Sequence, residues 1–184
     1  MKTLAISLVL FLAAAVSQAQ GIIELNETRV DYNPMFSEMT RHGNSYIMKV
    51  REDHSREFEK DPLTFLNNNF NIRQFISLID ESNYDSYIVT FRSNKGNLNA
   101  EYDMDGNLES ISHRFKNVAM PYSLIQQVFR DNEGWSVVKN SHIAYGKNGK
   151  IDRSYYKVTL KNGRQVKKVK IDAPALDRLA LAGN

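Results

Sequence analysis

The sequence contains no cysteine. That absence excludes disulfide bridges, thiol nucleophiles and zinc sites built on thiolates. The apolar fraction of 42% is nevertheless enough to form a core that burial alone stabilises. The length of 184 residues suits one domain, or two small domains fused together.

A large charge of one sign is also lacking, because the formal net charge is only +3. Proteins dedicated to nucleic acids or membrane surfaces carry a strong positive excess, so we expect neither partner. The charges are unevenly distributed along the chain. Residues 161–170 contain no acid, whereas residues 103–109 are acidic.

Long apolar runs are absent except for residues 4–16, and a membrane-spanning helix needs about 20 such residues. This run follows Lys2 and precedes Ser17 and Ala19, small residues at positions −3 and −1 of a cleavage site. The layout is typical of a signal peptide that is removed after Ala19. We therefore expect a periplasmic or secreted bacterial protein with no stable membrane insertion after cleavage.

Periodic patterns predict both strands and helices in the remaining chain. Apolar and polar residues alternate at 46–50, which predicts a half-buried strand. Asp61-Pro62 is a typical helix start, since the aspartate can cap and the proline needs no hydrogen-bond acceptor there. Apolar residues at 72, 75, 76 and 79 predict one face of a second helix. Pro121 opens a third helix, and further strands are predicted at 87–91, 98–102, 108–115, 135–145, 154–160 and 166–171.

Two of the predicted hairpins resemble each other at an offset of 69 residues. Laying 87–103 over 156–172 pairs apolar with apolar residues, for example Val89 with Val158 and Phe91 with Leu160. Two unrelated amphipathic hairpins would share the same alternation, so chance similarity is the alternative. A true repeat predicts an α+β fold, an antiparallel sheet with helices packed on one face, from a duplicated strand–helix–hairpin unit. The expected segments are a signal peptide (1–19), an irregular lead-in (20–41), a first α+β unit (42–106), a second α+β unit (107–172) and a tail (173–184).

Several short motifs occur together in an order that resembles a known family. They are Tyr-Asp-x-Asp-Gly-Asn-Leu at 102–108, Phe-Lys-Asn-Val at 115–118, Met120-Pro121, Gly134-Trp135 and Tyr-Lys-Val at 156–158 before Asn162-Gly163. This order, over residues 61–171, resembles the PepSY-like family of exported bacterial domains, which are related in fold to the β-lactamase-inhibitor protein. The resemblance implies tandem units of helix on antiparallel sheet. It also implies no catalytic residues and a role in binding or inhibiting another protein.

Motifs that carry catalysis are missing from the sequence. It has no His-Glu-x-x-His, no Gly-x-Ser-x-Gly and no glycine-rich phosphate loop. The stretch 101–106, which contains Asp103 and Asp105, resembles the start of a calcium loop, but the twelfth position of that loop is Ser112, which is no bidentate ligand. An Asp-Gly turn explains these residues without an ion, although ion binding stays open. We expect no enzyme activity, no cofactor and no metal.

The candidate binding site is the sheet face opposite the predicted helices. If Tyr156, Val158 and Leu160 point into the core, the residues that alternate with them in the strand point to the opposite face. By the repeat, alternate residues of 86–92 point to that same face. Exposed aromatic and cationic residues anchor many protein interfaces. We therefore expect a non-enzymatic binding or inhibitory module that recognises an envelope or secreted protein. The alternatives are a polyanion- or glycan-binding component that uses strand 161–170, and an uncharacterised hydrolase. The site residues predicted for the lead function are Tyr155, Lys157, Thr159, Lys161, Ile88 and Arg92.

The expected signal peptide at 1–19 leads to a testable prediction. Mass spectrometry of the mature protein should show a chain that begins at Gln20, either free or cyclised, because the signal peptide is cleaved after Ala19. A cytosolic protein that retains Met1 would contradict the assignment of residues 1–19.

Overall fold

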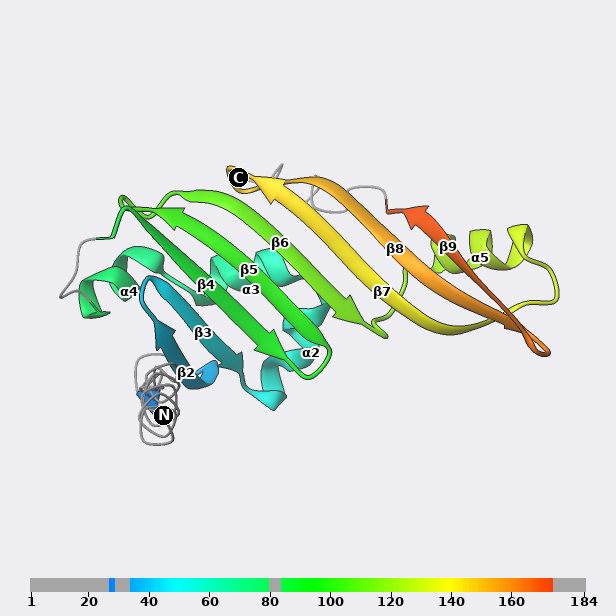
Figure 1. The fold of residues 1–184 in the computed structure, drawn as a ribbon, viewed down its shortest axis with the longest axis horizontal. Helices are drawn as coiled ribbons and strands as arrows, with labels where there is room; N and C mark the ends of the chain where they lie inside the picture. The colour runs from blue at the N-terminus through cyan, green and yellow to red at the C-terminus, as the bar shows by residue number, and fades with distance from the viewer. Residues whose placement is uncertain (1–26, 29–33, 80–83, 174–184) are drawn as a thin grey trace, which may run out of the picture.

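The computed structural model describes residues 27–28, 34–79 and 84–173, and Figure 1 shows its fold. The predicted signal peptide (1–19) and all but the first residue of the predicted tail (173–184) lie outside the described residues. The described part is an α+β protein with one nine-stranded sheet. None of its helices is long and apolar enough to cross a membrane.

The strands follow one another across the sheet in chain order. Neighbouring strands are antiparallel except β3 and β4, which are parallel because α2, α3 and α4 carry the chain back between them. The expectation of an α+β fold is thereby confirmed, and the expected antiparallel sheet is found except for the one parallel pair, β3 with β4. The elements are β1 (Glu27–Thr28), β2 (Phe36–His42), β3 (Ser45–Val50), α2 (Glu52–Lys60), α3 (Pro62–Asn69), α4 (Ile72–Ile79), β4 (Ser86–Ser93), β5 (Gly96–Asp103), β6 (Leu108–Lys116), α5 (Tyr122–Asp131), β7 (Ser136–Lys147), β8 (Lys150–Asn162) and β9 (Gln165–Asp172).

Two elements differ from the sequence-based expectation. The predicted irregular lead-in (20–41) contains all of β2 except His42, and the register of β2 shifts between Phe36 and Glu38. This irregularity places Phe36 and Met39, three residues apart, in the same core, so period two is lost from the sequence. Helix α2 buries only one apolar side chain, Phe58, and therefore has no apolar stripe that a pattern could reveal.

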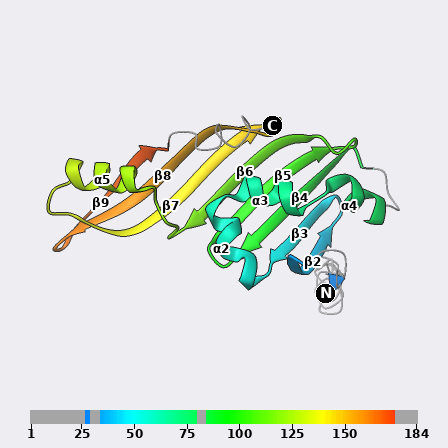
Figure 2. The ribbon, with the colours of Figure 1, turned by 180° about the vertical axis from the view of Figure 1, so that it is seen from behind.

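Residues of the helices and of the strands share one hydrophobic core. Side chains of β3–β6 alternate between buried and more exposed, and the buried apolar ones belong to the same hydrophobic cluster as apolar residues of the helices. Phe58 of α2 meets Phe115 of β6 at 5.2 Å between ring centroids, and Phe75 of α4 meets Tyr46 of β3 at 5.0 Å. Figure 2 shows α2, α3 and α4 in front of this half of the sheet and α5 in front of the other half. We call the sheet face with these contacts the inward face and its opposite the outward face.

Two histidines interrupt the apolar inward face at the middle of the sheet. Nε2 of His113 on β6 lies 3.3 Å from Nδ1 of His142 on β7, and Nε2 of His142 lies 2.8 Å from Oγ of Ser154 on β8. Burial, together with the neighbouring His142, lowers the pKa of His113 to about 3. Burial lowers the pKa of His142 to about 4. Both rings are therefore neutral at physiological pH.

These lowered pKa values predict how stability depends on pH. Below pH 6.5 the unfolded chain takes up protons on both histidines while the folded protein does not. The free energy of unfolding should fall as the pH drops from 6.5 towards 4, by up to about 1.4 kcal/mol per pH unit for each histidine. Urea unfolding of the wild type and of a His113→Asn/His142→Gln variant at several pH values measures this slope. An equal slope in both proteins would assign the pH dependence to other groups.

Candidate functional site

Backbone register decides where the six predicted site residues lie. On β4, Tyr87, Val89 and Phe91 are buried in the core, so Ile88 and Arg92 point outward. On β8, Tyr156, Val158 and Leu160 belong to the core. The residues that alternate with them, and that therefore point outward, are Tyr155, Lys157, Thr159 and Lys161.

The six residues share a face but do not form one contact cluster. Three strands separate β4 from β8, which corresponds to about 19 Å at about 4.8 Å per strand. One row of paired residues crosses this distance on the outward face. The row runs from β4 to β8 through Arg92, Asn97, Arg114, Ile143 and Tyr155.

The prediction that Tyr155 is exposed is wrong, because only 8% of its surface is exposed. Its partner in the row, Ile143, is only 4% exposed. Three cationic side chains also lie over the tyrosine ring. Their charged groups lie 4.5 Å (Lys170), 5.5 Å (Arg153) and 5.9 Å (Lys157) from the ring centroid. Tyr155 is thus the covered centre of a cationic cluster, because long cationic side chains bury their apolar stems on aromatic surface.

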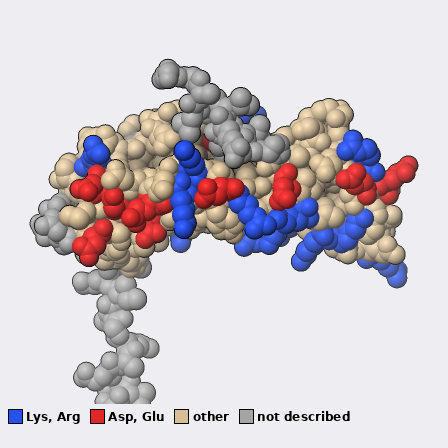
Figure 3. All heavy atoms as spheres, turned by 90° about the horizontal axis from the view of Figure 1, so that it is seen from above, with Lys and Arg blue, Asp and Glu red and all other residues tan. Residues whose placement is uncertain are grey.

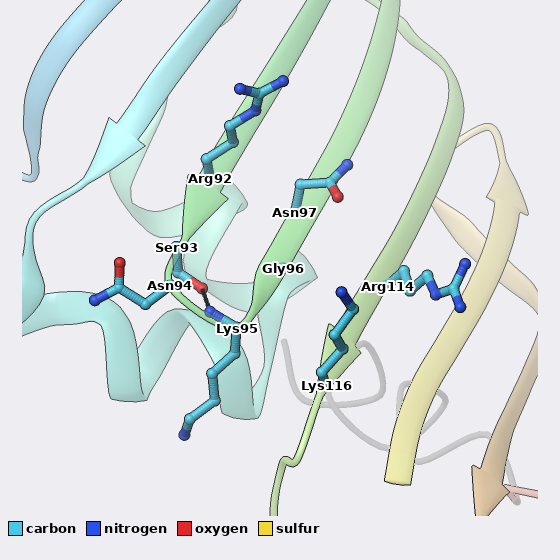
Figure 4. A pocket seen from close by; sticks show the side chains of 8 residues that line it. All are labelled: Arg92, Ser93, Asn94, Lys95, Gly96, Asn97, Arg114 and Lys116. Atoms are coloured by element: carbon cyan, nitrogen blue, oxygen red, sulfur yellow. Dashed lines mark hydrogen bonds between the residues drawn. The ribbon is translucent and has the colours of Figure 1, made fainter. Parts of the chain in front are cut away.

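Cations extend from this cluster towards the hairpin of β4 and β5. Figure 4 shows Arg92, Arg114 and Lys116 around a depression of about 470 Å³, with Arg114 extending towards β7. Within the described residues no carboxylate forms an ion pair with any of these three side chains. We call the outward-facing set Arg92, Arg114, Lys116, Arg153, Lys157 and Lys170 the cationic face.

The charges of the two halves differ. Figure 3 shows Lys and Arg gathered along one side of the half that contains β7–β9, and acidic residues gathered on the other half. Of the cationic face, Lys170 pairs with Asp172 at 3.1 Å. Tyr145 lies beside Arg153 and is 50% exposed, so the face also presents an aromatic side chain to solvent.

The basic strand does not form a single stripe. Lys167 contacts the ring of Trp135 at 4.3 Å, and its strand partner is the buried Leu160, so it lies on the inward side. Lys168 and Lys170 pair with Thr159 and Lys157 and point outward. The cations of residues 161–170 are therefore divided between two faces, as alternation in a strand requires.

The acidic turn at Asp103 is held by its own hydrogen bonds. Oδ1 of Asp103 accepts from the backbone N–H of Asp105 at 2.9 Å and of Asn107 at 2.8 Å, and Oδ2 accepts from Nδ2 of Asn107 at 2.8 Å. The side-chain hydrogen bond from Asn107, followed by the backbone ones, lowers the pKa of this carboxyl group. Within the described residues no cluster of three His, Cys, Asp or Glu side chains has the arrangement of a metal site. The carboxylate thus closes the turn between β5 and β6.

Arg114, Ile143 and Tyr145 are members of the site that sequence reasoning missed. The alternation at 111–115 could have placed Arg114 outward, since Ile111, His113 and Phe115 are its buried neighbours. Its neighbours across the sheet depend on the register of β6 with β7, for which the sequence has no local signal.

No protein-family model matches this chain, and no curated protein and no solved structure resembles it significantly.

Two tyrosines on the outward face provide a matched test of its packing. Tyr155→Ala should lower the free energy of unfolding by about 3 kcal/mol, because it removes a buried ring and leaves a cavity. Tyr145→Ala should change it by no more than about 0.5 kcal/mol, because that ring is half exposed. Urea unfolding measures both values. A negligible loss for Tyr155→Ala would show that its ring is not packed as described.

Proposed function

We propose that the protein is an exported, non-enzymatic module that binds an acidic surface of another envelope or secreted protein through its cationic face. The observation that carries this proposal is the set of outward arginines and lysines without acidic partners among the described residues, Arg92, Arg114 and Lys116 above all. Unpaired cations on one face favour a partner that supplies carboxylates.

The composition of the face supports a protein partner. Guanidinium groups such as those of Arg92, Arg114 and Arg153 bind carboxylates through two parallel hydrogen bonds. The half-exposed ring of Tyr145 adds apolar contact area beside these charges. Arginine and tyrosine are among the residues that contribute most to the affinity of protein interfaces.

The size of the cationic face also supports a protein partner. The row from Arg92 to Tyr155 spans about 19 Å, from about 4.8 Å per strand. A typical protein interface buries about 800 Å² on each partner, which requires a surface of such dimensions. A sheet supplies this surface on rigid backbone, so little conformational entropy is lost on binding.

The PepSY-like resemblance and the duplicated unit are part of the same proposal. The offset of 69 residues relates the hairpin β4–β5 to the hairpin β8–β9. In this scheme β3 and β6 are equivalent first strands, α2–α4 and α5 are equivalent helical segments, and β7 is an additional strand. Helices restricted to the inward face would leave the whole outward face free for a partner.

The function can be tested with two charge-matched variants of the immobilised protein. Arg114→Ala/Lys157→Ala removes two cations of the cationic face, and Arg56→Ala/Lys60→Ala removes two exposed cations of α2. An acidic protein retained stoichiometrically from an envelope extract should bind the first variant at least about tenfold more weakly, because each charged hydrogen bond contributes about 1.5–3 kcal/mol. Affinity for the second variant should be unchanged, and raising the salt concentration should weaken wild-type binding.

Two controls define the outcomes that contradict the proposal. Urea unfolding must show equal stability of both variants, so that lost binding is not caused by unfolding. Equal retention of the partner by both variants would exclude the cationic face. Retention of heparin or lipopolysaccharide at physiological salt, without any protein partner, would favour the polyanion alternative.

A further inference from the structure

The inward face contains a second, separate feature, a cavity of about 1030 Å³. Cavities of about 300–1,000 Å³ are the usual sites of small-molecule ligands. Figure 2 shows α2 and α3 over one half of the sheet and α5 over the other, with the middle strands between them. The floor is formed by His113, His142, Ser154 and Tyr156 of the strands. Apolar lining residues include Leu63 of α3 on one side and Met120, in the segment that precedes α5, on the other.

The rings on the cavity floor are fixed by one another. His142 stacks on Tyr156, with 4.5 Å between centroids and 11° between the ring planes. His113 meets His142 edge to face at 4.7 Å and packs against Phe115 at 5.4 Å. Polar groups held in this way are preorganised for a ligand.

The hydrogen-bonded chain from His113 through His142 to Ser154 has a preferred direction. Nδ1 of His113 is buried, and no group of the described residues forms a hydrogen bond with it. If Ser154 donated to His142 and His142 to His113, that buried Nδ1 would carry a proton without an acceptor, at a cost of about 1–3 kcal/mol. If instead His113 donates to His142 and His142 donates to Ser154, Nδ1 of His113 carries only a lone pair. Buried acceptors without partners are less rare in proteins than buried donors without partners, so this direction is preferred.

This direction leaves a free donor in the cavity. Nε2 of His142 donates to Oγ of Ser154, so the serine hydroxyl keeps its own proton for another acceptor. Because Nε2 is protonated, His142 cannot act as a base on Ser154. The arrangement is therefore suited to binding rather than to nucleophilic catalysis.

The charges around the cavity favour an uncharged ligand. Both floor histidines are neutral. Lining charges of both signs come from the α2–α3 region and the β4–β5 turn, and Lys95 already pairs with Glu59 at 2.9 Å. The lining charges are Asp53, Glu57, Glu59, Asp61, Arg56, Lys60 and Lys95, so the cavity offers no excess of positive charge to an anion.

We propose that this cavity binds a neutral, mostly apolar molecule and that the Ser154 hydroxyl donates a hydrogen bond to a carbonyl oxygen of that molecule. The site lies on the face opposite to the cationic face and is independent of it. Apolar walls supply the affinity by burial, and the single oriented donor selects ligands with an acceptor at one end.

Prodan, a neutral naphthyl ketone whose fluorescence reports polarity, is a suitable probe for the full-length protein. It should bind saturably, with emission shifted to shorter wavelength. Ser154→Ala should weaken its binding about three- to tenfold, as expected for the loss of one hydrogen bond. The corresponding dimethylaminonaphthalene without the ketone should bind wild type and Ser154→Ala equally.

Two further variants locate the probe. Ala119→Trp places a large ring at an exposed residue of the cavity lining and should abolish binding. Lys157→Ala, on the cationic face, should leave binding unchanged. Unsaturable fluorescence, or binding that Ala119→Trp leaves intact, would overturn the proposed site. Binding blocked by Ala119→Trp but equal in wild type and Ser154→Ala would overturn the role of the serine.

Discussion

The pairing of β6 with β7 is the constraint on which the rest of the molecule depends. Seven residue pairs, from Ser110 with Lys147 to Lys116 with Ser141, join the two halves into one sheet. On the outward face this ladder places Arg114 beside Ile143 and so continues the row that leads to Tyr155. On the inward face it brings His113 within hydrogen-bonding distance of His142. A slip of one residue would move each of these side chains to the opposite face.

One set of strands thus presents two different surfaces. Alternation puts the neutral His113–His142–Ser154 chain among apolar neighbours on one side and exposed cations on the other. On the inward side, low polarity keeps both histidines uncharged, as their lowered pKa values indicate. On the outward side, water screens the repulsion between cations, and the ring of Tyr155 packs beneath three of them. The two proposed sites can therefore differ in ligand chemistry although they share the same backbone.

Much of the fold could be predicted because most of its strands and helices have recognisable local sequence patterns. Alternation at 87–102 and 154–171 predicts the hairpins, and Asp61-Pro62 predicts the start of α3, where Asp61 accepts from the N–H of Thr64. Helix α2 and strand β2 could not be predicted, since Phe58 is the only apolar residue that α2 buries and a shift of register disrupts the period of β2. The candidate site was predicted in part. The side of the sheet to which each residue points follows from alternation, whereas the burial of Tyr155 and the neighbours of Arg114 across the sheet do not.

The sequence by itself determined the class of the fold, the absence of disulfides and which residues of each strand share a face. These properties depend on composition and on neighbours within a few residues. Tertiary structure decided the register of each pair and which strands became neighbours outside the predicted hairpins. Only that pairing placed Ile143 beside Tyr155 and His113 beside His142, pairs that are 12 and 29 residues apart in the chain. The physical reason is that register across a sheet is selected by the packing of the whole core, to which distant residues contribute as much as adjacent ones.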